Sequence, residues 1–325
     1  ELARFARLYG RTLDFFLAAE APSPEPVVRW RSRGERAARL RAERRFVRFC
    51  EDYARLEKFA RVKPGALPSV CATRPVDWAG VERLAEETRK VMELGSQPAP
   101  ALCSVLEDRH GVKVLIVDTQ GGGSSACTKG DFGFGILVNA ADAPWRRNFD
   151  IAHELYHLLT WDEPLPQPGE ATDKPLDEKF ADCFASVLLL PSDPVRDECR
   201  RRIHDDRLTH ADVVAIARGF GVSTEALLWR LKSLRVIPRS AVEQALTDDN
   251  LKQADRDERR EDHDRQQVRP SVRFVSLAFE CLQNGTLSRG AFAQMMGIRR
   301  GRVGEFLAEY GLDETGDFSG QVGAA

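Results

Sequence analysis

The chain has 325 residues, with 48 lysine and arginine side chains against 50 aspartate and glutamate side chains, so its net charge of −2 indicates no particular class of partner. The length predicts about two domains. There is no apolar run near the ~20 residues of a membrane-spanning helix and no secretory signal, and the seven cysteines form no CxxC pair, which is typical of reduced thiols. We therefore expect a cytoplasmic protein that does not bind membranes.

Residues 1–20 predict a helix, a turn at Gly10 and the start of a second helix. The pattern Leu8-Tyr-Gly-x-x-Leu-Asp-x-x-Leu17 resembles the end of a helix-turn-helix domain of the Xre type. The resemblance implies that a recognition helix precedes Glu1, and that the chain is a fragment of a protein that also binds DNA. A plain amphipathic helix pair is the alternative interpretation.

A Pro-rich break at residues 21–26 precedes a basic stretch with nine arginines between Arg29 and Arg48. Arginine-rich helices can follow phosphates, but acidic and apolar residues alternate with these arginines. The pattern therefore favours a solvated helix face that begins in this stretch and continues over residues 47–62. We expect residues 21–75 to form a helical arm that connects the DNA-binding part to the rest of the protein.

The following residues predict helices mixed with short strands. Helices are expected over residues 78–94 and 99–110, and strands over the β-branched and apolar segments 111–118, 125–128 and 134–139. The intervening triple glycine invites comparison with phosphate-binding loops, but the Lys-Ser/Thr of such loops is missing. A flexible hairpin is therefore the favoured interpretation.

The pentapeptide His153-Glu-Leu-Tyr-His157 is the strongest functional signal in the sequence. It lies in an apolar run that predicts a helix, and residues four apart share one helix face, so His153 and His157 can bind one metal ion. Glu154 lies one step round the helix, where its carboxylate can meet a water molecule. An edge strand beside such a helix would let an extended peptide bind through main-chain hydrogen bonds.

A zinc site of this type needs a third protein ligand. The extended pattern HExxHxxGxxH is excluded, because Thr160 and Glu163 stand where it requires glycine and histidine. A second helix is predicted over residues 176–190, and Glu178 lies at the edge of its apolar face. Glu178 is the predicted third ligand, and Asp182 is predicted to hydrogen-bond the free ring nitrogen of a ligating histidine. A solvated acidic helix end that suits the helix dipole is the alternative.

Three further segments are expected after this helix pair. Residues 208–237 predict a helix–turn–helix arrangement that packs on the core. Residues 241–270 predict a charged linker, because the run 248–269 lacks an apolar stripe. Residues 271–325 predict a small helical module, in which residues 287–307 have a helix-turn-helix rhythm.

Two separated motifs occur in a fixed order after a strand that ends at Asn139: Ala152-His-Glu-Leu-Tyr-His157 and Glu178-x-x-Ala-x-x-Phe-Ala-x-x-Leu-Leu-Leu-Pro191. This composite resembles the ImmA/IrrE family of metallopeptidases. One departure is Tyr156, because the family often has glycine there. The resemblance implies an α+β fold, mainly α, with a zincin-like core and a small sheet in residues 76–240 and additional helical modules.

The resemblance also implies a function. Members of the family are zinc-dependent endopeptidases that cleave or inactivate transcriptional repressors in stress responses and in the control of mobile elements. In this chain, Zn²⁺ would be bound by His153, His157 and Glu178. Glu154 would act as the general base that takes a proton from water and passes it to the leaving amine.

Several assignments stay open at this point. Tyr156, His210 and Arg146 are candidates for stabilising the oxyanion, and Cys127 could reach the metal as an inhibitory ligand. Two other functions are conceivable: a non-catalytic, zinc-stabilised DNA-binding regulator or antitoxin, and a helical interaction scaffold in which HExxH is accidental. Substitution of Glu154 separates the first of these from a peptidase, because only a peptidase would lose its effect.

Overall fold

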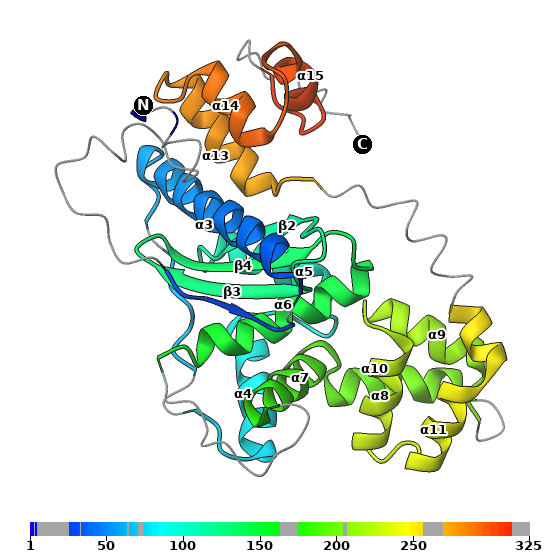
Figure 1. The fold of residues 1–325 in the computed structure, drawn as a ribbon. Helices are drawn as coiled ribbons and strands as arrows, with labels where there is room; N and C mark the ends of the chain where they lie inside the picture. Colours follow the sequence, from blue (N-terminus) through cyan, green and yellow to red (C-terminus); the bar gives the residue numbers. More distant parts are fainter. Residues whose placement is uncertain are drawn as a thin grey trace.

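The computed structural model describes residues 1–2, 4, 26–32, 34–63, 65–70, 74–162, 175–203, 207–255 and 269–313. The predicted end of a helix-turn-helix domain at residues 1–20 lies almost entirely outside these ranges. The fold is α+β and mainly α, as the sequence predicts, with a series of helices around one small sheet (Figure 1).

The sheet has four strands in the order β1 (Val28–Trp30), β3 (Ser125–Gly130), β4 (Gly133–Asn139) and β2 (Lys113–Val117). β3 is antiparallel to both of its neighbours, whereas β2 and β4 are parallel. Successive side chains of a strand point to opposite faces. Ala126 and Leu137 accordingly join the apolar cluster on one face, and Cys127 and Ile136 join the larger cluster on the other.

Helix α3 (Arg36–Phe59) covers the first face of the sheet, where its Phe46 and Cys50 pack against Leu137. The opposite side of α3 packs against the C-terminal helices through Tyr53 and Leu56. These C-terminal elements are α13 (Val272–Gln283), α14 (Arg289–Met296), the 3-10 helix η1 (Arg300–Arg302) and α15 (Val303–Ala308). α3 thus lies between the sheet and the C-terminal module.

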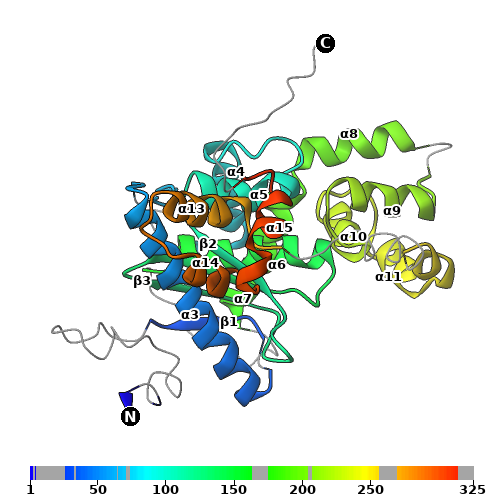
Figure 2. The same cartoon turned by 90° about the horizontal axis from the view of Figure 1, so that it is seen from above.

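The second face of the sheet carries α5 (Ala99–Asp108) and α6 (Pro144–Leu159), and α4 (Trp78–Val91) and α7 (Leu176–Leu189) pack beyond them. Figure 2 shows α8 (Ser192–Arg202), α9 (His210–Gly219), α10 (Thr224–Ser233) and α11 (Arg239–Thr247) to one side of the sheet. Thr209 and Ser223 cap α9 and α10 through side-chain hydrogen bonds to the first turn.

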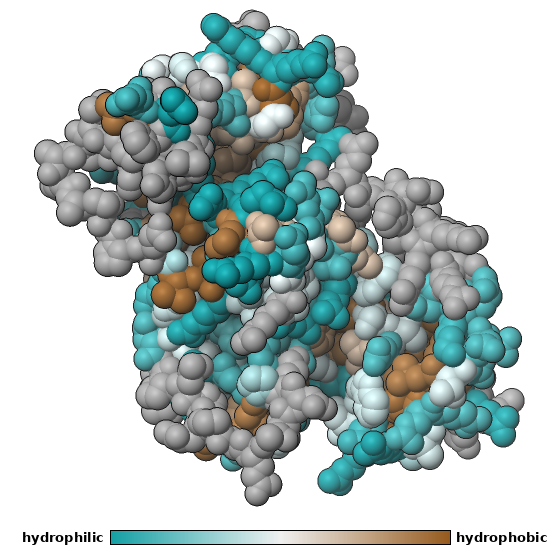
Figure 3. All heavy atoms as spheres, in the orientation of Figure 1, coloured by the Kyte–Doolittle hydropathy of each residue, from teal (hydrophilic) through white to brown (hydrophobic). Residues whose placement is uncertain are grey.

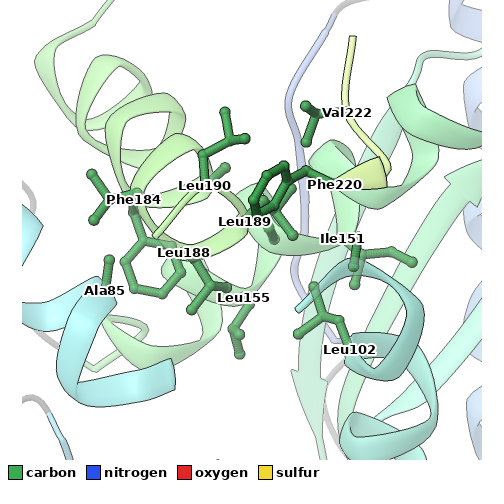
Figure 4. Close-up of a cluster of buried hydrophobic side chains, with 14 of the residues drawn as sticks. Ala85, Leu102, Ile151, Leu155, Phe184, Leu188, Leu189, Leu190, Phe220 and Val222 are labelled. Atoms are coloured by element: carbon green, nitrogen blue, oxygen red, sulfur yellow. The ribbon is translucent and has the colours of Figure 1, made fainter. Parts of the chain in front are cut away.

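One large apolar cluster fixes α6 and α7 relative to each other. Leu155 of α6 and Phe184 and Leu188 of α7 are fully buried in it (Figure 4). Phe220 and Val222, from the turn between α9 and α10, extend the same cluster. Because this core locks the two helices together, the polar side chains on their remaining faces are held in a defined relative position.

Two sequence-based expectations are wrong in part. Val28–Trp30 form a strand rather than the start of a helix, because β3 offers them an edge to pair with. Residues 241–255 are not an exposed linker, since Val242 and Leu251 are buried in the main apolar cluster. Val242 lies on α11, which ends at Thr247, and Leu251 lies on the helical segment that follows, so one apolar residue in each segment is enough for this packing although charges surround them.

No helix among the described residues is long and apolar enough to cross a membrane. Among the residues that Figure 3 colours, hydrophilic ones predominate and hydrophobic ones form separate groups.

Candidate metal centre

The HExxH pentapeptide lies on α6, deep inside the molecule. Pro144 occupies the first turn of α6, where its missing N–H costs no hydrogen bond. His153 and Glu154 are 0% and 1% exposed, and His157 is 5% exposed. Charged or ionisable groups at such depth need partners, so their contacts show what the site can do.

The two imidazoles and the carboxylate of Glu178 meet at one point. Nε2 of His153 lies 3.2 Å from Nε2 of His157. Glu178 reaches both rings from α7, with Oε2 at 3.3 Å from His153 Nε2 and Oε1 at 3.3 Å from His157 Nε2. Ligand atoms of the three residues all lie within 4.8 Å of one another, so the structure brings together the three residues predicted to bind the metal.

The other nitrogen of each ring lies near a carboxylate of α7. Nδ1 of His153 is 2.9 Å from Oδ1 of Asp182, and Nδ1 of His157 is 3.4 Å from Oδ2 of Asp177. An Nδ1–H that donates to a carboxylate leaves the Nε2 lone pair available for a metal. Both rings are therefore oriented with their ligating nitrogen toward the shared point.

Asp177 is itself held in place by two groups. Arg74 forms an ion pair with it and also donates to the carbonyl oxygen of Thr160. The hydroxyl of Tyr156 donates to Oδ1 of Asp177 at 3.3 Å. Although burial would raise the pKa of Asp177, its hydrogen bond to His157 and the charges of His157 and Arg74 lower it, so Asp177 stays ionised.

The same contacts shift the pKa values of two of the predicted ligands. Burial alone would lower the pKa of His157, but hydrogen bonds to Asp177 and Glu178 and nearby negative charges raise it to about 9. Burial would raise the pKa of Glu178, yet hydrogen bonds from His153 and His157 hold it far below its usual range. Without a metal, His157 therefore keeps its positive charge to a higher pH than an ordinary histidine does.

Glu154 lies next to this point and is held from β3. The hydroxyl of Ser125 donates to Oε1 of Glu154 at 2.6 Å. The Cys127 thiol also forms a hydrogen bond with Glu154. Burial of the thiol, followed by the negative charge of Glu154, raises the pKa of Cys127 well above its ordinary value. Cys127 is therefore a protonated donor, and it does not belong to the His153–His157–Glu178 group found among the described residues.

A cation fits the donor set. Within the described residues, Oε2 of Glu154 is buried and accepts no hydrogen bond, and Oε2 of Glu178 is buried with His153 Nε2 at 3.3 Å beside it. When both Nδ1–H groups donate to Asp182 and Asp177, neither Nε2 of the neutral rings carries a proton, so two lone pairs face each other across 3.2 Å. A metal ion shared by the rings and the Glu178 carboxylate would satisfy these groups, and its charge would stabilise the neighbouring Glu154 carboxylate.

The three candidates for oxyanion stabilisation lie elsewhere or have other partners. The Tyr156 side chain packs against Phe184 and donates to Asp177. His210, on α9, lies 3.6 Å from Asp248. Arg146 is 48% exposed and pairs with Asp150 one turn further along α6. The ring of Tyr156 lies edge-on to that of His157, with centroids 5.5 Å apart, but its hydroxyl is engaged with Asp177.

Sequence reasoning missed several supporting residues, above all Asp177, Ser125 and Arg74. Asp177 had a usable signal: two ligating histidines need two partners for their Nδ1 atoms, and it stands next to Glu178. Ser125 and Arg74 reach the site from β3 and from the segment before α4. Nothing in the local sequence pattern marks either of them.

Comparison with known proteins agrees with this geometry. Residues 107–232 match the family model described as IrrE N-terminal-like domain, one of the peptidase families. The match includes all of α6 and α7 and thus every residue of the HExxH motif and Glu178. No curated protein matches the chain.

Proposed function

Because residues 107–232 form an IrrE N-terminal-like domain of the ImmA/IrrE metallopeptidase family, we propose that the chain is a zinc-dependent endopeptidase that acts on a regulatory protein. One observation carries the proposal: ligand atoms of His153, His157 and Glu178 lie within 4.8 Å of one another, with Glu154 beside them. Metal-assisted hydrolysis of a peptide bond requires a metal ion and a base that reach the same water molecule.

The donor set favours zinc over magnesium or calcium. Two imidazole nitrogens and one carboxylate are the protein ligands typical of catalytic zinc sites, which keep a further position open for water or substrate. Magnesium and calcium prefer sites made of oxygen atoms alone. When bound, zinc would polarise the scissile carbonyl and lower the pKa of a water molecule from 15.7 to about 7.

Within this site, Glu154 moves the proton. The hydroxyl of Ser125 holds Oε1 at 2.6 Å, whereas Oε2 accepts no hydrogen bond from the described residues. Oε2 is thus the oxygen that takes a proton from the attacking water and passes it to the nitrogen of the leaving amine. The hydrogen bonds of Asp182 and Asp177 keep the rings of His153 and His157 oriented during these steps.

The proposed substrate is a transcriptional repressor, and the proposed setting is a regulatory switch in the cytoplasm. The resemblance of residues 1–17 to the end of a helix-turn-helix domain supports a link to DNA, either through this chain or through its substrate. A partner of this kind would be recognised over a large surface. We therefore expect slow cleavage of generic peptides and faster cleavage of the cognate protein.

The test compares the zinc-loaded full chain with its Glu154→Gln variant, which keeps the metal ligands but lacks the base. Both proteins are incubated with a peptide library made from a bacterial proteome, and new amino termini are labelled and sequenced by mass spectrometry. New termini that depend on Glu154 are expected. Equal numbers of new termini with both proteins, while both retain zinc, would favour a non-catalytic zinc-stabilised regulator.

A further inference from the structure

The strand β1 lies beside the metal centre, although its residues are far from α6 in the sequence. β1 pairs with β3 so that Arg29 lies opposite Cys127 and Trp30 opposite Ala126. β3 is the strand that supplies Ser125 and Cys127 to Glu154. Figure 1 shows β1 along the edge of β3. β1 is therefore separated from the general base by the width of a single strand.

The edge of β3 that β1 occupies is the edge available for a peptide. A strand edge binds an extended segment through its free N–H and C=O groups. The other edge of β3 is bonded to β4, within the sheet. A peptide that lies along β3 next to Glu154 must therefore take the position that Val28–Trp30 hold in this structure.

The side chains of β1 alternate between the two faces, as those of a bound peptide would. Trp30 points toward α3, where its Nε1 donates to Glu43 at 2.7 Å. Arg29 points to the opposite face, with its guanidinium 3.9 Å from the centre of the Trp161 ring. Arg31 lies on that same face, two residues on, and forms ion pairs with Asp150 and Asp182.

Arg31 connects this strand to a predicted metal ligand. Its Nη2 lies 2.9 Å from Oδ1 of Asp182, and the same oxygen lies 2.9 Å from Nδ1 of His153. Arg31 is 10% exposed and the Asp150 side chain is fully buried. Arg31 thus lies in an acidic environment. Asp150 belongs to α6 and Asp182 to α7, the two helices that carry the predicted metal ligands.

We propose that the segment Val28–Arg31 is an intramolecular inhibitor that occupies the substrate-binding edge of β3. This inference rests on the proposed peptidase function, and it implies a substrate class: an extended segment with basic side chains two residues apart. One basic side chain of the substrate pairs with Asp150 and Asp182, and the other stacks on Trp161. Substrate binds when β1 leaves the edge, so cleavage is limited by displacement of the chain's own strand.

The size of β1 suits a replaceable occupant. It forms three residue pairs with β3, which is the short end of the usual range for strands. The fit is nevertheless close, because a Cβ on Gly123 would lie 2.5 Å from the Trp30 ring. A short strand with a few strong side-chain contacts can be exchanged for a similar peptide without unfolding the sheet.

The test uses the full chain, loaded with zinc and carrying Glu154→Gln so that no peptide is consumed. The probe is a fluorescent peptide with the sequence of residues 26–32, and the control probe carries glutamine in place of both arginines. Binding is measured by anisotropy, and amide hydrogen exchange of residues 27–32 is followed with and without the probe. Arg31→Ala is compared with Arg36→Ala, which removes an exposed arginine of α3.

The probe is expected to bind, to accelerate exchange in residues 27–32, and to bind at least ~10-fold more tightly to Arg31→Ala, because that variant lacks charge-assisted bonds of the competing strand. The control probe should bind weakly. Equal affinity of Arg31→Ala and Arg36→Ala, no binding of the probe, or unchanged exchange with the probe bound would overturn the inference. Zinc content and Glu154-dependent cleavage of other peptides are separate readouts, so the proposed function can stand if this inference fails.

Discussion

Replacing Asp182 by alanine should weaken metal binding without removing a ligand. The substitution deletes the oxygen that lies 2.9 Å from Nδ1 of His153. Loss of such an outer partner typically lowers metal affinity 10- to 100-fold, or about 1.4–2.7 kcal/mol. The side chain of Asp182 is 34% exposed, so water can partly replace it, and we expect a loss near ~10-fold.

The assay is a titration of the metal-free protein with zinc in competition with a chromophoric chelator of known affinity. Asp193→Ala is the matched control, because Asp193 is an exposed aspartate in the first turn of α8. His153→Ala marks the complete loss of the site. If Asp182→Ala binds zinc as tightly as the control while His153→Ala does not, the hydrogen bond to Nδ1 does not orient the ligand and the reasoning is wrong.

Four other predictions follow from the same geometry. Glu154→Gln should lower the cleavage rate by ~10²–10⁴-fold and leave the zinc content unchanged. Tyr156→Phe should change the rate less than about threefold, because the Tyr156 hydroxyl contacts Asp177. Steady-state kinetics checks both variants, and a large loss of rate in Tyr156→Phe would show that the hydroxyl takes part in the reaction. In the metal-free protein, the pKa of His157 is about 9, against 6.5 in the unfolded chain. The folded state therefore binds more protons between these pH values, and its free energy of unfolding should fall as the pH rises from about 6.5 to about 9. Urea titrations that show a rise in the free energy of unfolding over this range would contradict the assignment. Phe184→Ala should destabilise the protein by about 3–5 kcal/mol, since this residue of α7 is fully buried in the cluster shared with α6. A change under 1 kcal/mol in the same titrations would show that this core does not fix the two helices.

Local patterns in the sequence are enough to predict the centre of the site. The spacing of His153 and His157 places both rings on one face of a helix, and the apolar face of residues 176–190 predicts a second helix with Glu178 at its start. Each of the two helices can be predicted from residues that lie within a few helical turns of one another in the sequence. The structure brings these three side chains together, as that pattern predicts.

The support around the site could not be predicted in the same way, because it depends on contacts between distant segments. Val28–Trp30 become a strand only because β3 provides an edge, and the arginines around them suggest a solvated helix. Arg74 reaches Asp177 from a segment without regular structure. Val242 and Leu251 look isolated among charged residues, yet the large apolar cluster buries both.

The most direct test of the central claim is the zinc content of the purified full chain beside His153→Ala, Glu178→Ala and Glu154→Gln, measured by elemental analysis after zinc loading and dialysis. The account predicts about one zinc per chain in the native protein and in Glu154→Gln, and loss of zinc in the two ligand variants. Native protein without zinc, or ligand variants that retain it, would contradict the metal centre on which the proposed peptidase function depends.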